Sequence, residues 1–90
     1  MKTYRVHIEG CVQGVGFRYD TQEKASQLEI QGWVRNCSDG TVETLIYGRE
    51  NQLNAMLEWL KHGPSSAKVS QIHIQAIHTE QAPSGFTITD

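Results

Sequence analysis

Apolar and polar residues alternate along several short segments of this 90-residue chain. Near the N-terminus, Tyr4, Val6 and Ile8 are separated by polar residues, and this period of two predicts a half-buried strand. Alternation, or a high content of β-branched and aromatic residues, predicts further strands at 33–36, 41–47, 67–77 and 86–88.

Two other segments have the spacing of helices with one apolar face. The first begins at Phe17, is expected to end near 29–31, and has a face made of Phe17, Thr21, Ala25 and Leu28. The second has an apolar face at positions i, i+3, i+4 and i+7, made of Leu53, Met56, Leu57 and Leu60. Gly63 and Pro64 are expected to stop it.

The resulting order is β-α-β-β-α-β with a short terminal strand. This order predicts an α+β fold of the ferredoxin-like, split-βαβ type, in which two helices cover one face of an antiparallel sheet. No repeat, linker or low-complexity tract interrupts the pattern, so we expect a single domain over residues 1–90. The fold by itself assigns no function, because many unrelated activities share it.

The segment from Gly10 to Gly16 contains three glycines and connects the first strand to the first helix. Backbone N–H groups can converge on an anion in such a loop, and the following helix N-terminus adds partial positive charge. Arg18 supplies a planar fork of donors suited to two oxygens of one phosphate. From these residues alone, a plain tight turn with a solvated Arg18 explains the pattern equally well.

Composition and charge exclude several classes of protein. The formal net charge is −2 and the isoelectric point is near 6.0, which argues against a nucleic-acid binder that relies on bulk positive charge. No apolar run is long enough to span a membrane, and the charged N-terminus is unlike a signal peptide, so we expect a cytoplasmic protein. The histidines lack metal-ligand spacing, and none is expected to sit in a cluster with cysteines or carboxylates, so no metal site is expected.

Two blocks of sequence match a known family. The run Gly10-Cys11-Val12-Gln13-Gly14-Val15-Gly16-Phe17-Arg18 resembles the signature loop of the acylphosphatase family, Gly-x-Val-Gln-Gly-Val-x-Phe-Arg. A second block runs from Gly32 through Asn36 and Gly40 to Val42, is followed by Gly48, and resembles the other motif of that family. With both blocks in order, the chain is identified as resembling a stand-alone acylphosphatase.

The resemblance implies hydrolysis of the anhydride bond between a carboxylic acid and phosphoric acid. It implies that Arg18 clamps the substrate phosphate and that Asn36 orients the attacking water. Backbone groups of the loop would help to bind the phosphate, at Cys11, Val12, Gln13, Gly14, Val15, Gly16 and Phe17. It further implies a small-molecule acyl phosphate substrate, with phosphate or sulfate as competing anions. No cofactor is expected, and charge and hydropathy argue against nucleic acid or membrane as a partner. A monomer is expected for a small domain with no evident exposed apolar stripe.

The residue chemistry agrees with this substrate class. Neither arginine nor asparagine titrates near neutral pH, so the two residues provide no general acid or base. A phosphomonoester would need one to protonate its leaving alkoxide. An acyl phosphate does not, because its leaving carboxylate belongs to an acid with a pKa of roughly 4. Positioning and charge stabilisation can then supply most of the catalysis.

Several alternatives stay open at this point. A ferredoxin-like domain can bind RNA on its open sheet face through aromatic residues, here Tyr4 and Tyr47. A phosphate-binding domain without turnover, or the front domain of a larger carbamoyltransferase, would share the same motifs. The sequence also leaves open whether Cys11 and Cys37 form a disulfide, and how firmly the final strand docks.

Overall fold

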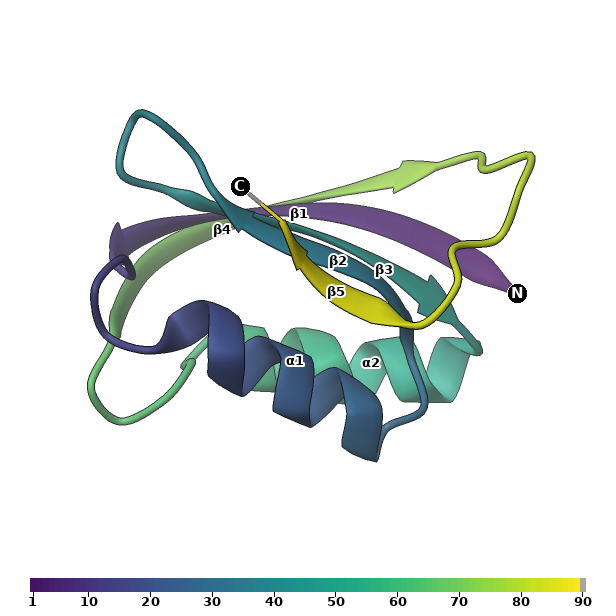
Figure 1. The fold of residues 1–90 in the computed structure, drawn as a ribbon, viewed down its shortest axis with the longest axis horizontal. Coiled ribbons are helices and arrows are strands. Elements are labelled where there is room, and N and C mark those ends of the chain that lie inside the picture. Colours follow the sequence, from purple (N-terminus) through teal and green to yellow (C-terminus); the bar gives the residue numbers. More distant parts are fainter. Residues whose placement is uncertain (90) are drawn as a thin grey trace.

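The computed structural model describes residues 1–89; Asp90 lies outside the described residues. Five strands and two helices follow one another in the predicted order (Figure 1). They are β1 (Lys2–Cys11), α1 (Phe17–Gln27), β2 (Gln31–Asn36), β3 (Val42–Gly48), α2 (Glu50–Leu60), β4 (Lys68–Ile77) and β5 (Phe86–Thr89). No helix among the described residues combines the length and apolar character that crossing a membrane requires.

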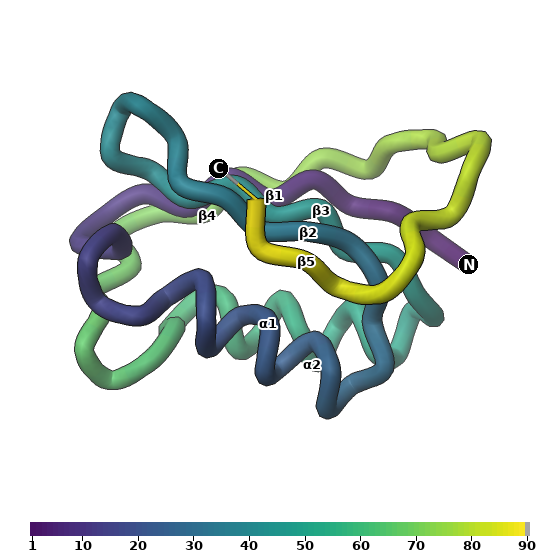
Figure 2. The backbone as a smooth tube through the Cα atoms, viewed as in Figure 1, coloured from purple at the N-terminus to yellow at the C-terminus, as the bar shows by residue number. Residues whose placement is uncertain are grey.

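The strands form one sheet in the order β4-β1-β3-β2-β5. The first four strands pair antiparallel, and both helices cover the same face, as the ferredoxin-like prediction required (Figure 1). The terminal strand β5 adds to the free edge of β2 in parallel, so the whole sheet is mixed. In Figure 2 the chain after β4 crosses the end of the sheet to reach this opposite edge.

The hydrophobic core lies between the helices and the covered face of the sheet. Alternate strand residues point into it, and the predicted apolar faces of the helices pack against them. Its members include Val6, Ile8, Val34, Ile46, Phe17, Ala25, Leu53, Met56 and Leu60. Each of these side chains is at most 1% exposed. The intervening strand residues, including Arg5, His7 and Trp33, form an open face that no helix covers.

Strand β1 is longer than predicted, because the predicted loop begins at Gly10 whereas the strand continues through Cys11. Its pairing with β4 shifts between Glu9 and Gly10, where a β-bulge accommodates the chain. Gly10 has φ +130°, and a Cβ there would lie 2.1 Å from the carbonyl oxygen of Lys68. Gly10 therefore permits close contact between two strands, which its position in a glycine-rich run did not predict.

The final strand is firmly placed, which answers a question that the sequence left open. The side-chain amide of Gln22 on α1 donates to the carbonyl oxygen of Phe86 over 3.0 Å. At the start of the strand, the N–H of Gly32 donates to the carbonyl oxygen of Gly85 over 2.9 Å. These bonds hold β5 between β2 and α1, so it forms part of the surface beside the loop.

Candidate active site

A small pocket opens where the loop after β1 enters α1. Its volume is about 230 Å³, and it is lined by Val12, Gly14, Gly16, Phe17, Arg18, Tyr19, Asn36 and Ile88. The lining combines the loop, the first turn of α1, the last residue of β2 and the end of β5. The structure thus brings Arg18 and Asn36, the two residues predicted to be catalytic, to one pocket although 18 positions separate them in the chain.

Two glycines give the loop its shape. Gly14 has φ +76° and Gly16 has φ +78°, in the left-handed region that other residues enter at a cost. Gly16 is also the N-cap of α1, and no described side chain caps that end of the helix. The first N–H groups of the helix lack partners within the helix, so together with its dipole they favour an anion in front of it.

Apolar anchors hold the loop on both sides of these glycines. Val12 and Phe17 are each 1% exposed and belong to the core. The Phe17 ring lies 5.9 Å from the ring of Trp59 between centroids, and Trp59 is partly buried against the core. On the other side of the loop, the Ser66 hydroxyl donates to the carbonyl oxygen of Val15 over 2.8 Å. The loop that lines the pocket is therefore anchored on both sides.

A polar side chain joins the loop to the turn between β2 and β3. The side-chain amide of Gln13 donates to the carbonyl oxygen of Cys37 over 2.7 Å and to that of Thr41 over 2.9 Å. The N–H of Cys37 in turn donates to the carbonyl oxygen of Thr41 over 2.8 Å, which closes the turn. Because Cys37 directly follows Asn36, these bonds fix the position of Asn36 relative to the loop.

Asn36 carries an unusual polar atom. Its side-chain oxygen Oδ1 is buried, and no group among residues 1–89 donates a hydrogen bond to it. Leaving such an acceptor unpaired costs about 1–3 kcal/mol, so few buried side-chain oxygens remain in this state. Since Asn36 lines the pocket, its oxygen can accept a hydrogen bond from a donor that enters there.

The other predicted loop residues divide into two groups. Four of them line the pocket, namely Val12, Gly14, Gly16 and Phe17. The remaining three are absent from its lining: Cys11 is exposed at the end of β1, Gln13 reaches the turn, and Val15 packs against the core.

Sequence reasoning missed Tyr19 and Ile88, which add exposed apolar surface to the pocket. Tyr19 directly follows Arg18, so its position could have been noticed. Ile88 could be found only from the parallel pairing of β5 with β2.

The turn between β2 and β3 gathers residues that sequence spacing kept apart. His7, Cys37 and Asp39 each place a possible ligand atom within 4.8 Å of the other two. The expectation that no histidine is clustered with a cysteine or carboxylate is therefore wrong for His7, because strand pairing joins distant segments. Both Cys11 and Cys37 are free thiols.

Hydrogen bonding also affects the Asp39 carboxylate in this turn. The hydroxyl and the backbone N–H of Thr41 both donate to Asp39 Oδ1, over 2.5 and 3.1 Å. These bonds favour the ionised carboxylate and lower the pKa of Asp39 below its ordinary value.

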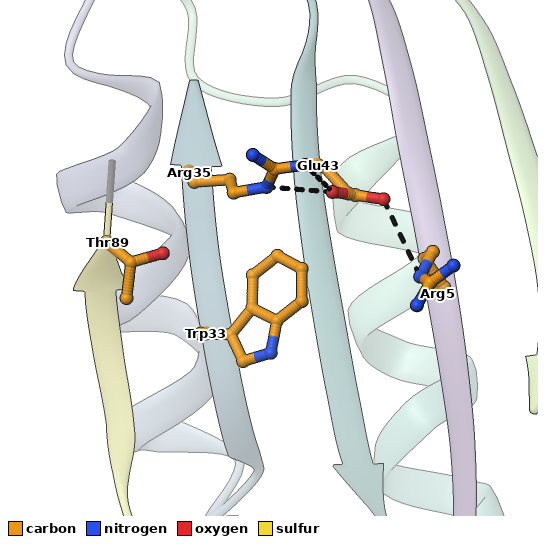
Figure 3. Close-up of a pocket in the computed structure, with 5 residues that line it drawn as sticks. All are labelled: Arg5, Trp33, Arg35, Glu43 and Thr89. Carbon is orange, nitrogen blue, oxygen red and sulfur yellow. Dashed lines mark hydrogen bonds and ion pairs between the residues drawn. The ribbon is translucent and has the colours of Figure 1, made fainter. Parts of the chain in front are cut away.

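A wider hollow of about 400 Å³ lies on the open face of the sheet, around Arg5, Trp33, Arg35, Glu43 and Thr89 (Figure 3). Glu43 lies between the two arginines, 2.6 Å from Arg35 Nη2 and 3.6 Å from Arg5 Nε. Its hydrogen bond raises the pKa of Arg35. One carboxylate therefore engages both guanidinium groups and offsets part of their positive charge in this hollow.

The two tyrosines that the sequence offered for RNA stacking lie on opposite faces of the sheet. Tyr4 pairs with Ile46, so its side chain points to the face that the helices cover, where it packs against the core. Tyr47 is the next residue along β3 and therefore points to the opposite face. The two tyrosines cannot form one stacking surface.

Comparisons with known proteins agree on one family. Residues 4–88 match the sequence profile of the acylphosphatase family. The chain is 46% identical over 81 residues to an acylphosphatase of Burkholderia lata, covering 90% of this chain and 83% of that protein. Among solved structures, it resembles the Bacillus subtilis acylphosphatase with a TM-score of 0.95 and 39% identity, over the full length of both chains. For the Coxiella burnetii acylphosphatase, the TM-score is 0.92 and the identity 36%, covering 98% of this chain and 92% of that one.

The family match covers nearly the whole chain, and it includes both segments that meet at the pocket. This chain therefore belongs to the acylphosphatase family and is an enzyme that hydrolyses acyl phosphates.

Proposed function

We propose that hydrolysis takes place in the pocket between the loop and the end of β2, with a separate role for each polar residue. Arg18 and the backbone N–H groups of the loop and of the first helical turn bind the phosphate. Asn36 accepts a hydrogen bond from the attacking water. The observation that carries this proposal is the buried, unpaired Oδ1 of Asn36 in the same pocket as Arg18.

The phosphate-binding part is supported by charge and shape together. Arg18 lies in the first turn of α1, where the helix dipole adds to its positive charge. The left-handed glycines leave the backbone N–H groups uncovered, since nothing occupies the space where their Cβ atoms would be. A pocket of about 230 Å³ is smaller than typical drug-sized sites of ~300–1,000 Å³ and suits one small anionic group.

The water-positioning part is supported by the acceptor itself. An attacking water has protons to donate, and the unpaired Oδ1 of Asn36 accepts one of them in a hydrogen bond. Holding water next to a bound phosphate turns an encounter between two molecules into a positioned reaction. The β2–β3 turn and Gln13 hold the backbone next to Asn36 in place, so a movement of side chains is enough to present the buried Oδ1 to a water in the pocket.

The lining also limits the substrates that the pocket can process. Among the described residues, its lining contains no carboxylate, histidine or thiol that could act as a general acid. Such a pocket cannot protonate an alkoxide leaving group, but it can release a carboxylate that needs no proton. The proton of the attacking water passes to the substrate phosphate or to solvent.

The same proposal includes the domain organisation of the enzyme, its location and the anions that compete with its substrate. We expect one domain over residues 1–90, acting as a cytoplasmic monomer without a metal ion or cofactor in the reaction. We also expect inorganic phosphate and sulfate to compete with substrate for Arg18, because both present the oxygens that its guanidinium binds.

The experiment measures phosphate release in the presence of EDTA from acetyl phosphate, benzoyl phosphate and the monoester p-nitrophenyl phosphate. We expect turnover of both acyl phosphates and little of the monoester. Arg18→Ala should lower kcat/KM by about 10³-fold or more. Lys24→Ala, which removes a positive charge near the other end of α1, is the matched control and should retain activity. Phosphate binding without turnover, or equal effects of the two substitutions, would contradict the proposal.

A further inference from the structure

A second cluster of ligand-type side chains lies apart from the catalytic pocket. It consists of His7 on β1 together with Cys37 and Asp39 in the turn between β2 and β3. Their ligand atoms all lie within 4.8 Å of one another. None of the three residues lines the pocket that holds Arg18 and Asn36.

Strand pairing explains why these residues meet although 30 positions separate His7 from Cys37. Strands β1 and β3 run antiparallel with Ile8 opposite Val42, which brings His7 near the end of the turn that precedes β3. His7 points to the open face, opposite to the buried Ile8. The Gln13 amide holds the turn through the carbonyl oxygens of Cys37 and Thr41. The turn that carries Cys37 and Asp39 is therefore held by hydrogen bonds, and His7 is held by the pairing of β1.

We propose that His7, Cys37 and Asp39 form a binding site for a divalent transition metal ion, with Zn²⁺ as the best match. Imidazole nitrogen, thiolate sulfur and carboxylate oxygen are the three ligand types that Zn²⁺ accepts. A thiolate disfavours Mg²⁺ and Ca²⁺, which prefer oxygen ligands. Binding releases the Cys37 thiol proton to solvent, and the thiolate and Asp39 together balance the charge of the ion.

The geometry requires only a small adjustment. With Zn–N and Zn–O distances near 2.1 Å and a Zn–S distance near 2.3 Å, ligand atoms of a tetrahedral site lie roughly 3.3–3.6 Å apart. The ligand atoms would have to approach one another by up to about 1.2–1.5 Å from the observed limit of 4.8 Å to form the site. Water can occupy the fourth position, since Asp39 is exposed and the other two side chains are half-buried.

Neighbouring groups already orient two of the ligands. The Thr41 hydroxyl lies 2.6 Å from Nε2 of His7 and donates to Asp39 Oδ1 over 2.5 Å. Hydrogen bonds of this kind to metal ligands fix their orientation and strengthen binding. His73 faces His7 across the strands, with ring centroids 6.4 Å apart, but its Nε2 is engaged with Glu9. His73 therefore lies beside the site without belonging to it.

This inference does not rest on the catalytic proposal, because none of the three ligands takes part in the reaction. The two sites are nevertheless linked along the backbone, since Cys37 directly follows Asn36.

The test measures Zn²⁺ binding to the full chain by competition with a chromophoric chelator, and Co²⁺ binding by absorption. We expect a single equivalent of metal and a thiolate-to-cobalt charge-transfer band in the near ultraviolet. Cys37→Ser should abolish the band, and Cys37→Ser, His7→Gln and Asp39→Asn should each weaken Zn²⁺ binding. The Zn²⁺ affinity should fall by at least about tenfold, since removing even a hydrogen-bond partner of a metal ligand costs about that much.

Matched controls make the result specific. Cys11→Ser removes the other thiol, and His73→Gln removes the neighbouring imidazole; both should leave the Zn²⁺ affinity and the cobalt band unchanged. Circular dichroism in EDTA checks that each variant is folded. Because Asp39 is exposed, Asp39→Asn should disturb the fold least of the three ligand variants. A cobalt band that survives Cys37→Ser, or Zn²⁺ affinity that depends on His73 and not on His7, would overturn the proposal.

Discussion

Gln13 donates from its side-chain amide to the carbonyl oxygen of Cys37 over 2.7 Å, and so joins the glycine-rich loop to the residue that follows Asn36. The same amide reaches the carbonyl oxygen of Thr41 over 2.9 Å. Loop and turn come from separate parts of the chain, and each contributes one of the two proposed catalytic residues. If Arg18 and Asn36 have the proposed roles, we expect Gln13 to act as a positioning residue that sets the distance between the bound phosphate and the attacking water.

Removing this link should damage catalysis more than phosphate binding. Gln13→Ala loses two hydrogen bonds, which should lower the free energy of unfolding by about 1–2 kcal/mol. We expect kcat to fall by roughly 10²-fold through misplacement of Asn36, while the inhibition constant for inorganic phosphate changes little. Gln27→Ala, the same substitution at an exposed position of α1, should alter neither quantity. A fall in phosphate affinity as large as the fall in kcat would contradict this role.

Two glycines with positive φ should respond very differently to alanine. At Gly10 a Cβ would lie 2.1 Å from the carbonyl oxygen of Lys68, whereas at Gly14 it would meet open space. Gly14→Ala should therefore cost only the backbone strain of about 1–2 kcal/mol. Gly10→Ala must also separate β1 from β4, and we expect a total loss of at least about 3 kcal/mol. Urea unfolding of both variants measures this difference, and equal losses would show that the bulge tolerates a side chain.

The pKa of Asp39 should depend on Thr41. The hydroxyl and N–H of Thr41 lower the pKa of this carboxyl, so its contribution to stability is present above the ordinary aspartate pKa. That contribution is lost as the pH falls through the lowered value. Thr41→Val removes the hydroxyl and should move the pKa back toward its ordinary value, as an NMR titration of the Asp39 carboxyl in EDTA would detect. Thr87→Val, at an exposed position of β5, is the control and should leave the Asp39 titration unchanged. An Asp39 titration that Thr41→Val also leaves unchanged would show that the Thr41 hydroxyl does not lower this pKa.

Local pattern was sufficient to predict most of the fold. The alternation of Tyr4, Val6 and Ile8 predicted both a strand and its buried face. The spacing of Leu53, Met56 and Leu60 predicted a helix and its buried face. These patterns arise from contacts between one element and the core, and the residues of that element record them directly.

Features that depend on pairing between distant segments could not be predicted in this way. Gly10 belongs to a strand because of its close approach to Lys68, and the glycine-rich run gave no indication of that neighbour. Ile88 reaches the pocket because β5 pairs in parallel with β2. His7 meets Cys37 only through the register of β1 and β3. The register of strand pairing cannot be read from a single sequence, so none of these three contacts could be predicted from it.

The division of labour between Arg18 and Asn36 is the central claim, and one paired measurement tests it most directly. The inhibition constant of inorganic phosphate and kcat for benzoyl phosphate are determined for the unmodified enzyme, Arg18→Ala and Asn36→Ala. We predict that Asn36→Ala lowers kcat by about 10²–10³-fold and leaves phosphate affinity nearly unchanged, whereas Arg18→Ala weakens phosphate binding as well. If Asn36→Ala, while folded, weakens phosphate binding as much as Arg18→Ala, or leaves kcat intact, the proposed role of Asn36 is wrong.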